Sequence, residues 1–123
     1  MSNDHAVIWL DAEHALIQNF DWTHADTRTL AREHLSTGAW FDALARSLAG
    51  AEEILVTGSG DAPRAFVDWV SAVSPAQRAR IFDVQPLAPQ RPEQLLAHAR
   101  RYFENVDRPH HLEPAAAGDV AAV

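Results

Sequence analysis

The sequence contains no cysteine and no lysine, and its 123 residues include a single methionine. Without cysteine the chain has no disulfide, thiolate nucleophile, iron–sulfur cluster or cysteine-type zinc site. Without lysine it cannot form a Walker-type phosphate loop, a Schiff base or a lysine general base. These two absences exclude several large enzyme classes before any pattern is considered.

Long apolar runs are also missing, since no stretch approaches the roughly 20 residues that span a bilayer. The N-terminal Met-Ser-Asn-Asp-His lacks the basic flank and apolar block of a secretion signal. We therefore expect a cytoplasmic protein with no membrane partner. The length suits one α/β domain over residues 1–107. Residues 108–123 lack periodicity and predict a flexible C-terminal tail.

Positive charge is scarce overall, because the formal net charge is -7 with histidine neutral. An acidic balance disfavours non-specific binding to a phosphate backbone. The arginines are unevenly placed, and residues 77–108 carry six of them against four acidic residues. That stretch either contacts RNA or forms a mixed, solvated face.

The N-terminal pattern predicts a β-hairpin. In "AVIWLDAEHALIQNFDW", residues 6–22, two β-rich runs flank a polar break. The expected pairing sets Leu10 opposite Ala15 and Ile8 opposite Ile17. Both faces of this hairpin are apolar, so we expect both to be covered. Residues 23–38 fit either a third, polar strand or a short helix.

The second half alternates helices and strands. A helix capped by Ser36 or Thr37 and ended by Gly50 is followed by the buried strand "EILVTG". A second helix, capped by Asp61 or Ser59, has its inner face at Phe66, Val67, Val70 and Val73, and Ser74-Pro75 ends it. "RIFDVQPL" predicts another strand, and Pro92 opens a last helix. The expected order is a hairpin or meander followed by α-β-α-β-α, forming a mixed sheet.

The turn Gly58-Ser59-Gly60 resembles a phosphate-binding loop but lacks its requirements. A dinucleotide fingerprint needs glycine at position 63, where proline stands, and Asp61 places negative charge where a phosphate would lie. A nucleophile elbow needs glycine at positions 57 and 61. The turn therefore predicts a strand-to-helix connection, with a docking loop as the alternative.

Other polar and aromatic residues are candidates for functional sites. The carboxylates Asp11, Asp61 and Asp83 near strand ends suggest a metal-dependent hydrolase as one alternative. The seven histidines show no ligand pair at helical spacing with an acid between them. Among the tryptophans, Trp22 is the one that remains open as a stacking platform, because the others fall on or beside apolar faces.

Three stretches carry a family resemblance: "HAVIWLDAEHALIQNF", "FDALARSLAGAEEILVTGSGDAPRAFVDWV" and "IFDVQPL…QLLAHARRYF". They resemble small bacterial proteins related to the middle domain of the eukaryotic and archaeal peptide-chain release factor and of its paralogue Pelota. The resemblance covers about residues 5–104. It implies a translational machinery component with a ribonuclease H-like sheet, and it favours a third strand at 27–34.

Release factors carry Gly-Gly-Gln on the loop before the first long helix, where the glutamine supports peptidyl-tRNA ester hydrolysis. The corresponding loop here, residues 24–38, has no glutamine and no paired glycine. The resemblance therefore does not transfer hydrolysis, and Pelota, which also lacks the motif, is the closer analogue.

These observations favour a non-catalytic domain that associates with ribosome or tRNA, weakly and in a salt-sensitive manner, without catalytic residue, cofactor or metal. An acidic protein-interaction module with a protein partner and the hydrolase above are the alternatives. The residues expected to dock a partner form the turn Gly58, Ser59, Gly60 and Asp61. The residues expected to contact RNA are Arg28, Arg32, Arg100 and Arg101.

Overall fold

The computed structural model describes residues 4–112. An initial run of three strands is followed by interspersed helices and strands. The elements are β1 (His5–Leu10), β2 (His14–Phe20), β3 (Ala25–Ala31), α1 (Thr37–Ser47), β4 (Glu53–Gly58), α2 (Ala62–Val73), α3 (Pro75–Arg78), β5 (Ile81–Pro86) and α4 (Pro92–Leu112).

The strands form one five-stranded sheet in the order β3-β2-β1-β4-β5. Neighbours β1, β2 and β3 are antiparallel, whereas β1, β4 and β5 are parallel. The predicted hairpin register is confirmed, since Leu10 lies opposite Ala15 and Ile8 opposite Ile17. This is the mixed, ribonuclease H-like sheet that the sequence predicted.

The ambiguous segment after the hairpin forms strand β3. Its residues pair with β2 along the whole strand, from His14 opposite Ala31 to Phe20 opposite Ala25. The strand lies at the sheet edge and is mostly exposed, which explains its polar sequence. Pairing with β2 therefore outweighs the helical propensity of these residues.

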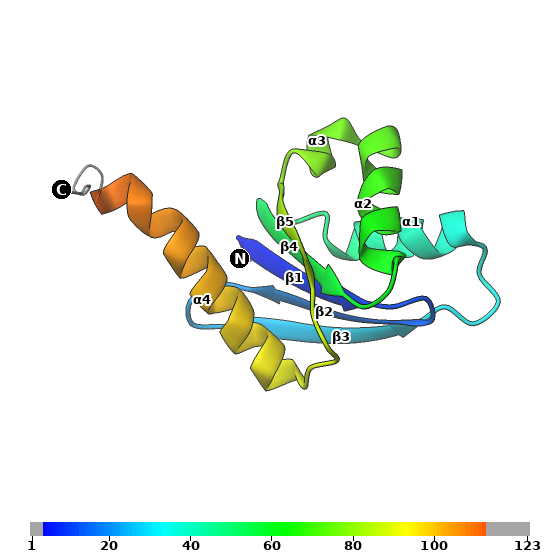
Figure 1. Cartoon of the computed structure of the whole chain (residues 1–123), viewed down its shortest axis with the longest axis horizontal. Helices are drawn as coiled ribbons and strands as arrows, with labels where there is room; N and C mark the ends of the chain where they lie inside the picture. Colours follow the sequence, from blue (N-terminus) through cyan, green and yellow to red (C-terminus); the bar gives the residue numbers. More distant parts are fainter. Residues whose placement is uncertain (1–3, 113–123) are drawn as a thin grey trace.

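Both faces of the sheet are covered, as the apolar hairpin predicted. Side chains alternate along β1 and β2, so Ile8 and Ile17 pack under α1 and α2, while Val7 and Leu16 pack under α4. Figure 1 shows α4 crossing the sheet apart from α1 and α2. The molecule is thus a sheet between two helical layers, and its two cores lie on opposite sides of β1.

Helix α1 begins as the sequence predicted but ends differently. The Ser36 hydroxyl oxygen accepts a hydrogen bond from the Ala39 amide at 3.2 Å, which caps the first turn. The predicted end at Gly50 was wrong, because the helix ends at Ser47 and the Leu48 amide donates back to the carbonyl of Ala45. Leu48 has αR backbone angles, so this end needs no glycine.

Helix α2 buries Phe66, Val67 and Val70 against the sheet and ends before Ser74-Pro75 as predicted. Val73 was predicted on the same inner face, but it is 58% exposed. Helical spacing gives the direction of a side chain and not the extent of the surface beneath it. At the last residue of α2, the chain already turns into α3, and Val73 faces solvent.

Helix α4 begins at Pro92 as predicted and continues to Leu112, beyond the expected end at residue 107. It packs Leu95, Ala99 and Phe103 on the sheet. Residues 113–123 of the predicted tail lie outside the described residues, so the flexible tail stays a prediction. Within residues 4–112, no helix has the length and apolar character needed to cross a bilayer.

Candidate functional site

The turn from β4 into α2 is built on two glycines. Gly58 has φ 153° and Gly60 has φ 67°, both in the region that favours glycine. A Cβ on Gly58 would overlap the carbonyl oxygen of Leu10 and lie 2.8 Å from Pro63 Cγ. A Cβ on Gly60 would meet no atom within 4 Å. Gly58 is therefore required for close packing, and Gly60 for backbone conformation alone.

Backbone hydrogen bonds hold this turn on both sides. The Ser59 amide donates to the Leu10 carbonyl at 3.1 Å, and the Leu87 amide donates to the Gly58 carbonyl at 2.8 Å. Asp61 occupies the N-cap position of α2, as predicted, but its side chain makes no capping hydrogen bond. The turn thus fixes the start of α2 over the ends of β1 and β4, and it leaves the Asp61 carboxylate exposed.

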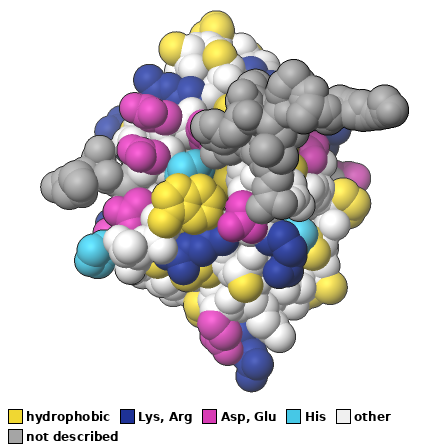
Figure 2. Space-filling model, turned by 90° about the vertical axis from the view of Figure 1, so that its left-hand side faces the viewer, with side chains coloured by type: hydrophobic (Ala, Val, Ile, Leu, Met, Phe, Trp, Pro, Cys, Tyr) yellow, Lys and Arg dark blue, Asp and Glu magenta, His cyan; other side chains and the backbone are white. Residues whose placement is uncertain are grey.

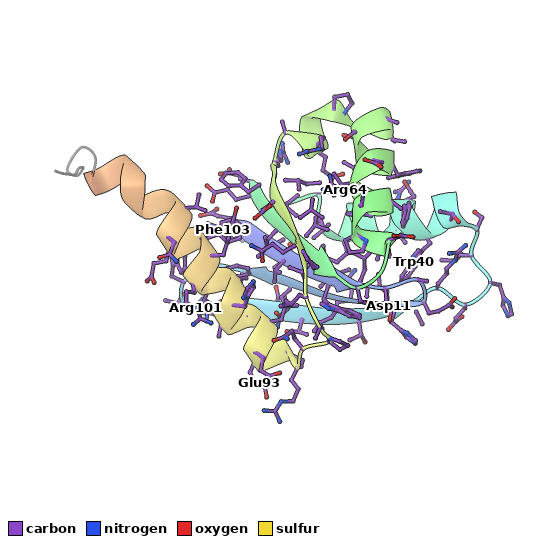
Figure 3. All side chains as sticks on the ribbon, in the orientation of Figure 1. Asp11, Trp40, Arg64, Glu93, Arg101 and Phe103 are labelled. Carbon is purple, nitrogen blue, oxygen red and sulfur yellow. The ribbon has the colours of Figure 1, made fainter. Side chains whose placement is uncertain are left out.

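Next to this turn lies a cavity of about 540 Å³. It opens at the carboxyl ends of β1 and β4, the edge of the sheet where α/β folds tend to place ligands. Figure 3 shows Asp11 and Trp40 at this end of the molecule. The lining residues come from the β1–β2 turn, the start of α1 and the start of α2: Asp11, Ala12, Glu13, Arg32, Thr37, Trp40, Phe41, Ser59, Gly60, Asp61, Ala62 and Ala65.

The polar side chains of the cavity have unequal local roles. Asp11 Oδ1 accepts hydrogen bonds from the amides of Glu13 at 2.8 Å and His14 at 2.7 Å, which shapes the β1–β2 turn. The Arg32 guanidinium donates to the carbonyl oxygen of Leu35 and to Thr37 Oγ1, both at 3.0 Å. Arg32 therefore ties the end of β3 to the start of α1.

Trp40 also lines this cavity, and its indole carries a buried hydrogen-bond donor. It is 1% exposed, and its Nε1–H has no hydrogen-bond acceptor among the described residues. By contrast, the Nε1–H of Trp9 donates to the Leu87 carbonyl at 2.8 Å. Sequence patterning correctly predicted Trp40 as a core residue, but periodicity carries no information on whether an indole N–H finds an acceptor.

The three carboxylates considered for a hydrolase do not meet. Asp11 and Asp61 line the cavity, whereas Asp83 lies opposite Leu55 along β5 and lines a separate cavity of about 220 Å³. The parallel register sets Asp83 away from the carboxyl ends of the strands, so the structure does not group it with Asp11 and Asp61. Within the part of the chain described, no group of three His, Asp or Glu residues is arranged to hold a metal ion.

The four arginines proposed for RNA lie on opposite sides of the sheet. Arg28 pairs with Ile17 and so shares the face covered by α1, and Arg32 lines the cavity on that side. Arg100 and Arg101 are on α4, which covers the other face (Figure 3). The four residues therefore do not form one continuous basic surface.

Arg100 has a structural role that composition did not reveal. Its guanidinium donates to the Asp21 carbonyl at 2.8 Å and lies 5.8 Å from the centroid of the Phe20 ring. It thereby anchors the β2–β3 turn to α4. Figure 2 shows that arginine and acidic side chains are interspersed on the end of the molecule away from the cavity. This arrangement weakens the local positive field that RNA would need.

Among the described residues, four groups outside the cavity lining have shifted pKa values, and two of them are Asp21 and His98. Hydrogen bonds from the backbone amides of Thr23 and His24 lower the pKa of Asp21. Burial lowers the pKa of His98, and the nearby charge of Arg101 adds to the effect. Both groups serve local structure, since Asp21 shapes the β2–β3 turn and His98 hydrogen-bonds Gln85 at 2.8 Å.

Comparison with solved structures identifies domains of similar fold. Archaeoglobus fulgidus Pelota matches 92% of this chain and 36% of its own length, with a TM-score of 0.69 and 12% identity. Saccharomyces cerevisiae Dom34 matches 91% of this chain and 37% of its own length, with a TM-score of 0.61 and 9% identity. The archaeal translation termination factor aRF1 matches 89% of this chain and 39% of its own length, with a TM-score of 0.57 and 14% identity.

The shared feature is the fold. At these identities the likeness extends to the mixed five-stranded sheet with its helices, and this chain spans a little over a third of each of those proteins. No protein-family model and no curated protein matches the sequence. The predicted resemblance to Pelota and the release factor is thus confirmed for the fold.

Proposed function

We propose that this chain is a non-catalytic, translation-associated domain that docks on the ribosome or tRNA. The observation that carries the proposal is the fold match over 92% of the chain to Pelota. Dom34, of similar fold, is described as a translation termination-like factor in RNA quality control. The comparison supports a translation-related role, and the particular partner is our inference.

The absence of a release-type loop supports a non-catalytic role. Strand β3 occupies Ala25–Ala31, so only residues 32–36 connect it to α1. This short connection contains neither glycine nor glutamine. Peptide release by ester hydrolysis needs a loop that brings a glutamine and a backbone amide close to the ester carbonyl. Residues 32–36 do not supply one.

Sedimentation with ribosomes tests the docking proposal. The full chain is mixed with ribosomes of the organism that encodes it, and the bound fraction is followed at rising salt. We expect weak binding that fades with salt, because exposed arginines such as Arg28 and Arg101 supply separate point contacts. Absence of the chain from ribosomal fractions at low salt would contradict the proposal.

A release assay tests the non-catalytic part. We expect no hydrolysis of peptidyl-tRNA by the purified chain, with or without ribosomes. Activity that persists through repurification and is lost when residues 32–36 are shortened would refute this part.

The acidic character of the cavity favours a second candidate, a protein-interaction module. Three of its lining residues, Asp11, Glu13 and Asp61, are carboxylates. Ribosome binding and protein binding are distinguishable, because an RNA-dominated contact is lost on nuclease treatment of the particles. A protein-mediated contact survives that treatment.

A further inference from the structure

Strand β3 leaves one edge of the sheet open. It is the outer strand next to β2 (Figure 1), and its residues are exposed apart from the half-buried Leu30. The strand pairs with β2 along its whole length, with no bulge and no proline. A regular edge strand presents a row of unpaired backbone groups that can pair with another chain.

Two backbone hydrogen bonds determine which residues of β3 face outward. The Arg32 amide donates to the Glu13 carbonyl at 2.9 Å, and the Asp21 amide donates to the His24 carbonyl at 3.0 Å. Both bonds continue the β2–β3 register, so the even-numbered residues of β3 direct their backbone groups toward β2. The odd-numbered residues therefore direct their N–H and C=O groups away from the sheet: Ala25, Thr27, Thr29 and Ala31.

The opposite edge of the sheet is less suited to pairing. Strand β5 has a register shift against β4 between Ile54 and Leu55, and it ends at Pro86, which has no amide N–H. Strand β3 has neither feature. It carries instead one charge of each sign, Asp26 and Arg28.

These two charges are complementary to those of a second β3 strand. Asp26 and Arg28 are exposed, they lie on one face of the strand, and within residues 4–112 no ion pair includes either of them. If two β3 strands pair antiparallel with Thr27 opposite Thr27, each Asp26 lies opposite an Arg28. A shift of one residue in either direction sets Asp26 opposite Asp26 or Arg28 opposite Arg28. Like charges directly opposite each other are destabilising, so the charges select the register at Thr27.

We propose that two copies of this chain associate by antiparallel pairing of their β3 strands about a two-fold axis at Thr27. Thr27 then pairs with Thr27 of the second copy, and Ala25 pairs with Thr29. Each of these pairs exchanges two N–H···O=C hydrogen bonds, because their backbone groups face outward in both copies. The product is one continuous sheet across the dimer.

The side chains of β3 fit this contact on both faces of the sheet. Thr27 lies opposite Gln18, which donates to the Pro92 carbonyl of α4, so the small side chains of the odd-numbered residues lie on the face covered by α4. Arg28 lies opposite Ile17, so the charged pairs lie on the face covered by α1 and α2. The charged pairs and the backbone pairs therefore form side by side without competing.

Sedimentation equilibrium of the full chain measures the association. The average mass should rise from 13.6 kDa toward twice that value as the concentration increases. Asp26→Arg and Arg28→Asp each replace two cross-strand attractions with repulsions, so each should weaken the dimer by about tenfold. The double variant restores opposite charges across the contact and should restore the affinity. The matched control Asp68→Arg, at an exposed position on α2, should leave the affinity unchanged.

Cysteine trapping tests the register, because the chain has no cysteine of its own. In the proposed dimer the two Thr27 Cα atoms lie about 5.5 Å apart, within the range that a disulfide spans. The two Thr29 Cα atoms lie more than about 13 Å apart, which is too far. Under mild oxidation Thr27→Cys should therefore form a disulfide-linked dimer, whereas Thr29→Cys should not.

Three results would overturn the inference. One is an average mass that stays at the monomer value up to millimolar concentration. Another is equal cross-linking of Thr27→Cys and Thr29→Cys, since the contact would then have no fixed register. The third is failure of the double charge variant to recover the affinity lost in the single variants. Because these assays contain no ribosomes, their failure is distinct from failure of the translation proposal.

Discussion

Replacing Gly58 with alanine is expected to destabilise the fold strongly. The added Cβ would overlap the Leu10 carbonyl oxygen and press on Pro63 Cγ at 2.8 Å. Relief requires movement of β4 away from β1, which weakens the Ser59–Leu10 and Leu87–Gly58 backbone hydrogen bonds. Backbone strain costs about 1–3 kcal/mol, and each weakened bond costs about 1 kcal/mol. We therefore expect a loss of about 3–5 kcal/mol.

Two other glycines provide matched controls. Gly60 also has positive φ, but its Cβ position is open, so Gly60→Ala is expected to cost about 1 kcal/mol. Gly38 lies in the first turn of α1 with ordinary φ and open space. Gly38→Ala is expected to stabilise the protein by about 0.5–1 kcal/mol, because alanine restricts the unfolded chain.

Urea unfolding followed by tryptophan fluorescence measures all three variants. The free energy of unfolding should rank Gly38→Ala above the unmodified chain, then Gly60→Ala, then Gly58→Ala. A cost at Gly58 equal to or smaller than that at Gly60 would refute the reasoning, since the two sites differ mainly by the contact with Leu10. An unchanged slope of the unfolding free energy against urea concentration would confirm that the variants expose the same surface area on unfolding.

Three further predictions concern other parts of the molecule. Arg100→Ala is expected to lower the free energy of unfolding by about 1–2 kcal/mol, because its hydrogen bonds to the β2–β3 turn are lost. The control Arg101→Ala, at an exposed position, should change the free energy of unfolding by under about 0.5 kcal/mol. Equal effects of the two variants in urea titrations would contradict this. His98 should titrate below 6.5 by nuclear magnetic resonance. Because its folded pKa is lowered, its contribution to stability is present above the ordinary value of 6.5 and is lost as pH falls from there through the folded pKa; a midpoint at or above 6.5 would contradict the assignment. ATP or NAD should not raise the melting temperature, because Asp61 and the lack of lysine leave no phosphate cradle; robust stabilisation would overturn this reading of the turn.

Alternation and turn chemistry predicted much of the fold from local sequence. The period-2 pattern around Ile8 and Ile17 determined the hairpin register, and Ser36 marked the start of α1. Local sequence did not decide between strand and helix for β3, because its strand conformation depends on pairing with β2. It also failed at Val73, where exposure depends on the extent of the neighbouring surface.

The candidate site was less predictable than the fold. Sequence pointed to the Gly58–Asp61 turn, because paired glycines between a strand and a helix are visible locally. It did not predict that Asp11 and Trp40 would meet this turn around one cavity, since that depends on the packing of α1 and the hairpin against it. The orphaned Trp40 donor and the separation of Asp83 are likewise properties of tertiary structure.

Association of this domain with the translation machinery, without catalysis of peptide release, is what we propose for it. Its most direct test is purification of the chain from the organism that encodes it, at low salt, with the ribosomal particles separated by sedimentation. We expect a fraction of the chain to travel with the particles and to be released as salt rises. A chain confined to the unbound fraction at every salt concentration would contradict it.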